Sequence, residues 1–278
     1  MNKSGHLSNI KVLMYHRVLE EAPGEGTSWH YVLAESFRKQ LKLIDDLGYT
    51  PITFYDYLLY REDKLTLPKN PIIITFDDGY LDTYEVALPI LMEYGMSAVI
   101  FALGNRSLQR ALWDENGQND RCALMTDEQL QIADSLGFEI GAHSMNHLDL
   151  TTVGEAELYS EIVASKKNLE TFLEKPVVTF AYPYGRINNK TRKLAIEAGY
   201  HFACGVYTGP YRFGDDLFDI RRLAINSDVN TLQYLMRLIT PYQYVEWLYA
   251  RTVGQGAQSN QQETIVKERL HDVEKTMF

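Results

Sequence analysis

Short apolar runs alternate along this chain with segments in which apolar residues recur at helical spacing. Between residues 37 and 47 apolar residues recur every three or four positions, which predicts an amphipathic helix that ends at Gly48. The apolar runs are short and rich in β-branched residues, which is typical of buried strands. They predict strands over 10–15, 71–76, 97–102, 138–142, 177–181, 200–204 and 218–225.

Helical patterns fill most of the intervals between these strands. We predict further helices over 83–94, 126–136, 155–173, 190–198, from Asn230 to the residues before Pro241, and over 242–250. Two of the starting points, 126–129 and 152–155, have the form of a capping box. Pro89 lies inside the first of these helices, and we expect it to kink that helix or restart it.

Strands that alternate with helices pair in parallel through right-handed crossovers. Six or seven such units fit either a doubly wound sheet or an incomplete (β/α) barrel. The polar stretch 106–121 is predicted to be an inserted loop. After Gly254 the composition becomes polar, so we predict one domain over 1–254 and a polar tail over 255–278.

The charge balance excludes some classes of partner. The 278 residues include 27 Lys and Arg against 37 Asp and Glu, which gives a formal charge of −10. Nucleic acids and acidic membrane surfaces are bound mainly through Lys and Arg, so this balance argues against both. The longest apolar stretches, such as 98–103, are far shorter than the roughly 20 residues of a membrane-spanning helix. We therefore predict no transmembrane segment.

The first residues of the chain and its cysteines indicate the cellular compartment in which the protein is expected. Residues 1–15 lack the continuous apolar region of a signal peptide. Cys122 and Cys204 form neither a CxxC motif nor a disulfide framework. We expect two free thiols and a cytoplasmic location, or an exported protein if a leader has been removed.

Polar residues suited to catalysis directly follow four of the predicted strands. They are His16, the pair Asp77-Asp78, the segment 143–147 with His143 and His147, and the segment 182–185. In a parallel barrel the carboxyl ends of all strands lie at one pole, where active sites are built. Taken alone, the aspartate pair and the segment 182–185 are typical of a turn or a helix cap. The two histidines alone would be typical of a loop pair, and His16 alone of a structural residue. Their occurrence at four equivalent positions predicts one shared site.

Two imidazoles and a carboxylate form a suitable ligand set for a catalytic divalent metal. Zinc sites of this kind use three protein ligands and leave a position open for water and substrate. Such a metal lowers the pKa of its bound water and polarises a carbonyl oxygen. Adjacent residues cannot easily face the same ion, so we expect one aspartate of the pair to bind the metal. The other would then accept the proton of the water.

The segments 75–79 (Thr-Phe-Asp-Asp-Gly) and 143–147 (His-Ser-Met-Asn-His) resemble the first two motifs of the polysaccharide deacetylases, the NodB-homology domain of carbohydrate esterase family 4. The resemblance extends from about Lys11 to Asn226. The segment 12–18 (Val-Leu-Met-Tyr-His-Arg-Val) is similar to the subgroup that deacetylates poly-N-acetylglucosamine. This resemblance implies a distorted (β/α) barrel of about seven parallel strands, with the active site at the C-terminal ends of the strands.

The resemblance also implies a role for each matching residue. Asp77 matches the general base, and His16 matches the general acid of the subgroup. The ligands of one divalent ion are matched by Asp78, His143 and His147. Zinc is the expected metal, and cobalt, nickel or iron(II) would accept the same ligands.

The third motif of the family maps to 181–185, where the resemblance implies that the backbone N–H of Tyr184 stabilises an oxyanion. The Arg that opens this motif in the wider family is Ala181 here, and the C-terminal Leu-x-His motif is missing. The histidine of the N-terminal motif replaces the latter in the subgroup. Arg221 or Arg222 could supply the charge that orients the base.

The predicted reaction is the metal-dependent hydrolysis of N-acetyl groups on an amino-sugar glycan, with release of acetate. The expected glycan resembles poly-N-acetylglucosamine, and a soluble or lipid-linked intermediate is an alternative. Tyr182, Tyr184 and Trp113 are candidates for stacking on sugar rings, although ordinary rim aromatics are at least as common. The same metal site would serve an O-acetyl esterase or a small-amide hydrolase. A catalytically silent glycan-binding relative is the remaining alternative.

Overall fold

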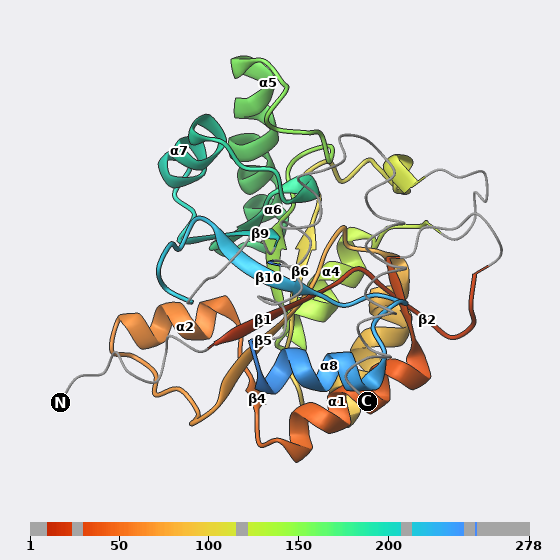
Figure 1. The fold of residues 1–278 in the computed structure, drawn as a ribbon. Helices are drawn as coiled ribbons and strands as arrows, with labels where there is room; N and C mark the ends of the chain where they lie inside the picture. Colours follow the sequence, from red (N-terminus) through yellow and green to blue (C-terminus); the bar gives the residue numbers. More distant parts are fainter. Residues whose placement is uncertain (1–9, 24–29, 115–121, 207–212, 242–247, 249–278) are drawn as a thin grey trace.

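Seven parallel strands form a closed barrel at the centre of the molecule (Figure 1). The structure is a computed structural model that describes residues 10–23, 30–114, 122–206, 213–241 and 248. Around the barrel the strands are β1 (Lys11–Tyr15), β5 (Pro71–Phe76), β6 (Val99–Ala102), β7 (Glu139–Ala142), β8 (Thr179–Ala181), β9 (Phe202–Val206) and β10 (Ile220–Ala224). The ring closes because β1 pairs with both β5 and β10. The prediction of a (β/α) barrel is therefore confirmed.

Three short strands lie outside the ring. The two-residue β4 (Thr50–Pro51) pairs with the start of β5. A separate parallel pair consists of β2 (Arg17–Leu19) and β3 (Tyr31–Leu33). The sequence pattern did not predict these strands, because two or three residues are too few to show a period.

Helices surround the barrel, and α1 and α8 pack together beside it (Figure 1). The α-helices are α1 (Ala34–Asp46), α2 (Phe54–Arg61), α3 (Leu88–Glu93), α4 (Asp127–Ser135), α5 (Glu155–Tyr159), α6 (Ser165–Leu173), α7 (Asn189–Glu197) and α8 (Thr231–Ile239). Single π-helical turns occur at η2 (Thr83–Ala87) and η4 (Ser160–Ala164), and short 3₁₀ turns occur at η3 (Leu112–Asp114) and η5 (Pro183–Gly185). Within the described ranges, no helix is long and apolar enough to cross a membrane.

Most predicted helix boundaries are confirmed, with one clear error. Thr126 caps α4 in a reciprocal capping box, and Asn230 caps α8 in the same way. The predicted capping box at 152–155 is wrong, because Gly154 precedes α5 and has no side chain that could cap it. Pro89 lies in the first turn of α3, so the helix restarts there after η2, as expected.

Some predictions concern residues that lie largely or wholly outside the described ranges. They are the helix over 242–250, of which residue 248 alone is described, the tail over 255–278, and the later part of the inserted loop over 106–121. Helix α2 was not predicted from the sequence. Its inward-facing residues, Phe54, Tyr57 and Leu58, cover a single turn, which is too short to reveal a helical period in the sequence.

Alternate residues on each strand point to opposite sides of the barrel wall, and they form two separate hydrophobic clusters. The cluster inside the barrel includes Val12, Ile73, Val99, Phe101, Ala181, Phe202 and Ile220. The cluster under the helices includes Leu13, Ile72, Ile74, Ile100, Phe180 and Leu223. This alternation decides which polar residues near the strand ends face the barrel axis.

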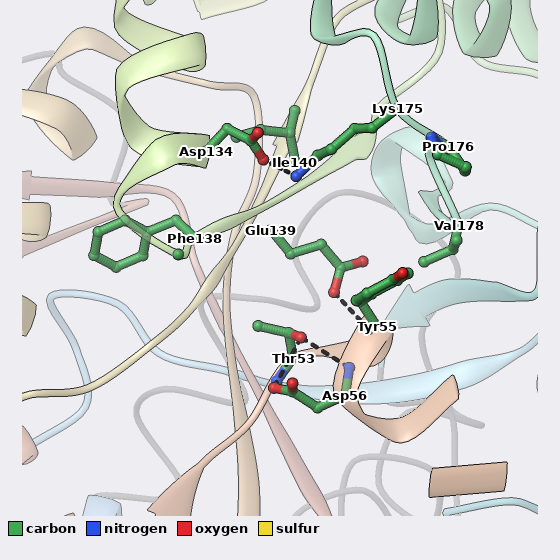
Figure 2. Close-up of a pocket in the computed structure, with 11 residues that line it drawn as sticks. Thr53, Tyr55, Asp56, Asp134, Phe138, Glu139, Ile140, Lys175, Pro176 and Val178 are labelled. Carbon is green, nitrogen blue, oxygen red and sulfur yellow. Dashed lines mark hydrogen bonds and ion pairs between the residues drawn. The ribbon is translucent and has the colours of Figure 1, made fainter. Parts of the chain in front are cut away.

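A pocket of about 280 Å³ lies at the end of the barrel where the strands begin (Figure 2). Glu139, the first residue of β7, is buried there and accepts hydrogen bonds from Tyr55 N and Thr179 Oγ1, both at 2.8 Å. It thereby attaches the first turn of α2 to this end of the barrel. Burial raises the pKa of Glu139 to about 7, although these hydrogen bonds favour the ionised form.

This raised pKa predicts how stability varies with pH. The folded state binds the Glu139 proton more tightly than the unfolded state, whose pKa is near 4.5. The stabilisation from this proton is therefore complete below about pH 4.5 and is lost as the pH rises through about 7. Relative to Glu139→Gln, the wild-type protein should lose about 2–3 kcal/mol of unfolding free energy between pH 5 and pH 8. Urea unfolding of both proteins measures this, and identical pH profiles would contradict it.

Candidate active site

Asp77 and Asp78 directly follow β5, yet their carboxylates have different surroundings. The residues of β5 alternate between the barrel interior and the helix layer, so Asp77 continues the inward series of Ile73 and Thr75. At Asp78 the backbone enters the left-handed region, with φ 73°. This turn breaks the alternation, so both carboxylates can lie at the same pole and face different partners.

Arg222 from β10 holds Asp77 in a bidentate ion pair. Its Nη1 and Nη2 atoms lie 2.5 and 2.8 Å from the two carboxylate oxygens, and the side chain is only 1% exposed. Burial raises the pKa of Asp77, but Arg222 and the nearby His143 lower it below its usual value. The carboxylate is therefore ionised at neutral pH. The neighbouring Arg221 forms a different ion pair, in which its Nη2 atom lies 3.3 Å from Asp219 Oδ2.

The second carboxylate lies against two imidazoles. Asp78 Oδ1 is 3.3 Å from His143 Nε2 and 3.2 Å from His147 Nε2. One ligand atom from each of the three residues lies within 4.8 Å of the others, and all three residues are buried. Burial raises the pKa of Asp78, but the two imidazoles lower it well below its usual range.

This donor set fits a divalent metal ion. Apart from these two imidazole nitrogens, the buried Asp78 Oδ1 has no polar partner among the described residues. His143 Nδ1 lies 2.8 Å from the carbonyl oxygen of Ala181. An Nδ1–H that donates to this carbonyl leaves the lone pair of Nε2 available to a metal. One carboxylate and two imidazoles are ordinary zinc ligands, so the three residues could hold such an ion.

A buried carboxylate from outside the sequence motifs holds the loop that carries the two histidines. Glu161, in the π-helical turn η4, accepts hydrogen bonds from the backbone N–H groups of Met145 and Asn146 at 3.1 and 2.9 Å. The backbone at Ser144 and His147 is left-handed, with φ 63° and 60°. Glu161 helps to hold this strained loop in place. It was not found from the sequence, because only the helical turn of η4 brings it to the loop.

His16 directly follows β1, at the same pole. It is close enough to Asp77 to contribute to the lowered pKa of that carboxyl group. The ring of His16 stacks on that of His30, with 4.8 Å between centroids and 18° between planes. The next residue is anchored, because Arg17 Nε lies 2.7 Å from Asp82 Oδ2. His30 was missed by sequence reasoning, since no motif includes it.

The three aromatic residues expected to stack on sugar rings have different positions. Tyr182 is fully buried, and its hydroxyl donates to Phe218 O at 3.2 Å, so that prediction is wrong. Tyr184 is 51% exposed and lies at the pole, with its ring centroid 4.7 Å from that of His147. Trp113 also lies at the pole, but its ring stacks on His147.

Comparison with known proteins agrees with this geometry. The family described as polysaccharide deacetylase matches residues 64–203. YxkH of Bacillus subtilis, which is named as a polysaccharide deacetylase, is 32% identical over 80% of this chain and 74% of its own length. The chain belongs to the polysaccharide deacetylase family. It is therefore a hydrolase of the carbohydrate deacetylase type, as the sequence predicted.

Other members of the family are similar over most of this chain. The poly-beta-1,6-N-acetyl-D-glucosamine N-deacetylase of Staphylococcus aureus strain MRSA252 is 26% identical over 72% of this chain and 69% of its own length. The Streptococcus pyogenes deacetylase PplD, solved with acetate, has a TM-score of 0.69 and 25% identity over 84% of this chain and 98% of its own. IcaB from Ammonifex degensii shares the fold, with a TM-score of 0.64 and 21% identity over 82% of this chain and 96% of its own.

The ion pair between Asp77 and Arg222 predicts a large stability difference between two neighbouring substitutions. Arg222→Met leaves a buried carboxylate unpaired, so it should lower the free energy of unfolding by about 3–5 kcal/mol. Arg221→Met, the matched control, removes a less buried ion pair and should cost about 1 kcal/mol or less. Urea unfolding at pH 7 measures both.

A double variant separates the unpaired charge from lost packing. Asp77→Asn combined with Arg222→Met should recover part of the lost stability, because no ionised group remains buried without a partner. Equal losses for Arg222→Met and Arg221→Met would show that the ion pair does not stabilise the barrel.

Proposed function

We propose that this protein hydrolyses N-acetyl groups on a glycan of the poly-N-acetylglucosamine type and releases acetate. The observation that carries the proposal is the separation of two adjacent carboxylates. Asp77 is paired with Arg222, while Asp78 lies against two imidazoles. One carboxylate is thus available as a base and the other as a metal ligand. The similarity to named poly-beta-1,6-N-acetyl-D-glucosamine N-deacetylases supports the substrate class.

Asp78, His143 and His147 would hold one divalent ion, for which we propose zinc. Such an ion supplies Lewis acidity to the acetyl carbonyl and makes the attacking water more acidic. Cobalt, nickel or iron(II) would suit the same ligands. Three protein ligands leave room for both water and substrate.

Asp77 would accept the proton of the attacking water. The ion pair with Arg222 keeps the carboxylate ionised and fixes its orientation. A carboxylate with a lowered pKa is a weak base, so it is effective only towards an acidified water. The backbone N–H of Tyr184 would donate to the oxyanion that develops on the acetyl oxygen, and a donor of this kind contributes around 3–4 kcal/mol.

His16 would donate a proton to the amine nitrogen as the bond to the acetyl group breaks. An amine anion is a very poor leaving group, so amide hydrolysis needs this proton. The aromatic ring of His30 covers one face of the His16 ring and restricts its orientation. General acid catalysis by a residue held in this way typically contributes about 10²–10⁴-fold.

Acetate release tests the proposed reaction directly. The purified protein should release acetate from β-1,6-linked N-acetylglucosamine oligomers, lose this activity with a chelator, and regain it when zinc is restored. A β-1,4-linked N-acetylglucosamine oligomer and an O-acetylated glycan serve as comparison substrates. Acetate from the O-acetylated glycan alone would favour an esterase. Activity that resists the chelator would contradict the metal site, and no activity on any substrate would favour a glycan-binding protein.

The acid role predicts a difference between amide and ester substrates for His16→Ala. An alkoxide leaves far more readily than an amine anion, so kcat should fall by about 10²–10⁴-fold on the N-acetyl substrate and much less on an acetyl ester. KM and bound metal should change little, since the proton is needed late in the reaction. Steady-state kinetics and metal analysis measure these quantities.

His201→Ala is the matched control, because His201 is exposed and directly precedes β9, at the end of the barrel opposite the active site. It should leave both activities unchanged. Equal losses on amide and ester in His16→Ala, or loss of bound metal, would contradict the assignment of His16 as the acid.

A further inference from the structure

The two histidines of the proposed metal site are oriented in different ways. His143 has a hydrogen-bond partner for its second ring nitrogen, the carbonyl oxygen of Ala181. The Nδ1 atom of His147 is buried and has no hydrogen-bond partner within the described part of the chain. Metal-binding histidines usually donate the second ring N–H to an acceptor that fixes the ring plane. Another interaction must therefore set the orientation of the His147 ring.

Aromatic rings supply this interaction. The Trp113 ring stacks face to face on His147, with 4.1 Å between centroids and 14° between planes. Tyr184 meets the His147 ring at 4.7 Å and 71°, and His143 meets it at 5.0 Å and 63°. Of these neighbours, Trp113 alone lies parallel to His147, so its ring defines the plane in which the imidazole lies.

The chain brings Trp113 to this place through contacts with the loop after β5. Leu124 forms an antiparallel bridge with Tyr80, and Ala123 forms another with Arg110. Tyr80 and Leu124 also belong to a small buried cluster against which Trp113 packs. The segment before Trp113 is thus attached next to the two aspartates, and the indole is held over the imidazole.

We propose that Trp113 is a positioning residue that orients His147 for metal binding through ring stacking. The proposal rests on the proposed function of Asp78, His143 and His147 as a metal site. An imidazole that binds a divalent cation becomes electron-poor, and the electron-rich face of an indole attracts such a ring. Stacking would therefore strengthen on metal binding, and Trp113 would replace the hydrogen bond that His147 lacks.

The affinity for zinc tests the proposal without any measurement of activity. Competition with a chromogenic zinc chelator gives the dissociation constant of each variant. Trp113→Leu keeps apolar volume but removes the ring, and it should weaken zinc binding by about tenfold or more, the usual effect of losing a residue that orients a ligand. Trp113→Phe keeps a stacking ring and should stay within roughly threefold of the wild-type affinity.

Ile44→Ala is the control for a general loss of stability. Ile44 in α1 is fully buried under the helices and lies outside the cluster against which Trp113 packs. This variant should lower the thermal unfolding temperature while zinc affinity stays near the wild-type value. Equal weakening of zinc binding in Ile44→Ala and Trp113→Leu would overturn the proposal, because reduced stability alone would then explain the effect.

Quenching of tryptophan fluorescence by cobalt gives a second readout. Cobalt at the site would lie next to Trp113, so the wild-type protein should lose more emission on cobalt addition than Trp113→Phe, which keeps the other two tryptophans of the chain. Unchanged zinc affinity in Trp113→Leu would overturn the proposal while leaving the metal site intact. No zinc binding by the wild-type protein would overturn the metal site, and the role of Trp113 with it.

Discussion

The ion pair between Asp77 and Arg222 is the interaction on which the rest of the site depends. Two adjacent buried carboxylates repel each other, and both stay ionised only if each has its own positive or hydrogen-bonding partner. Arg222 neutralises Asp77 from inside the barrel, while the left-handed backbone at Asp78 turns the second carboxylate to the imidazoles. Without the arginine, the low-dielectric interior would favour protonation of Asp77, and the site would lose its base.

The barrel itself holds Arg222 in place. The Nε atom donates to Gly205 O at 3.0 Å, Nη1 donates to Thr75 Oγ1 at 3.2 Å, and the guanidinium lies 5.3 Å from the centroid of the Phe101 ring. Space for that ring depends on Gly141, where an added Cβ would lie only 2.6 Å from Phe101. Residues from five strands therefore fix the orientation of a single carboxylate. This explains how the chain can lack the arginine of the third motif, at Ala181, and still present an oriented base.

The pattern of strands and helices left a doubly wound sheet and a barrel open, and the family resemblance implied the barrel. The positions of the polar segments directly after strands predicted that they meet at one pole, because the carboxyl ends of parallel barrel strands lie together. The sequence could also have chosen between Arg221 and Arg222. Ile220 faces the barrel interior, so Arg222, two residues later, faces it too. The same alternation separates Ala181, which faces inward, from Tyr182, which faces the helices. Tyr182 was expected to stack on sugar because it was taken as an exposed loop residue, whereas it continues the strand and packs under the helices.

Other residues of the site reach it through tertiary contacts that leave no periodic pattern in the sequence. Glu161 reaches the histidine loop from a π-helical turn, and His30 stacks on His16 across residues of no recognisable motif. Trp113 lies over His147 because its segment is bridged to Tyr80. Contacts of this kind arise when loops fold over the pole. The sequence shows which residues the loops contain, but not which of them meet.

The central claim is that the neighbouring aspartates have different tasks, and a comparison of Asp77→Asn with Asp78→Asn tests it most directly. Bound metal and turnover would be measured on the same preparations. Asp78→Asn should lose both together, since a neutral amide is a far poorer ligand than a carboxylate. Asp77→Asn should keep the metal, while turnover falls about 10²-fold or more. Equal loss of metal in both variants, or full metal occupancy in Asp78→Asn, would contradict the account.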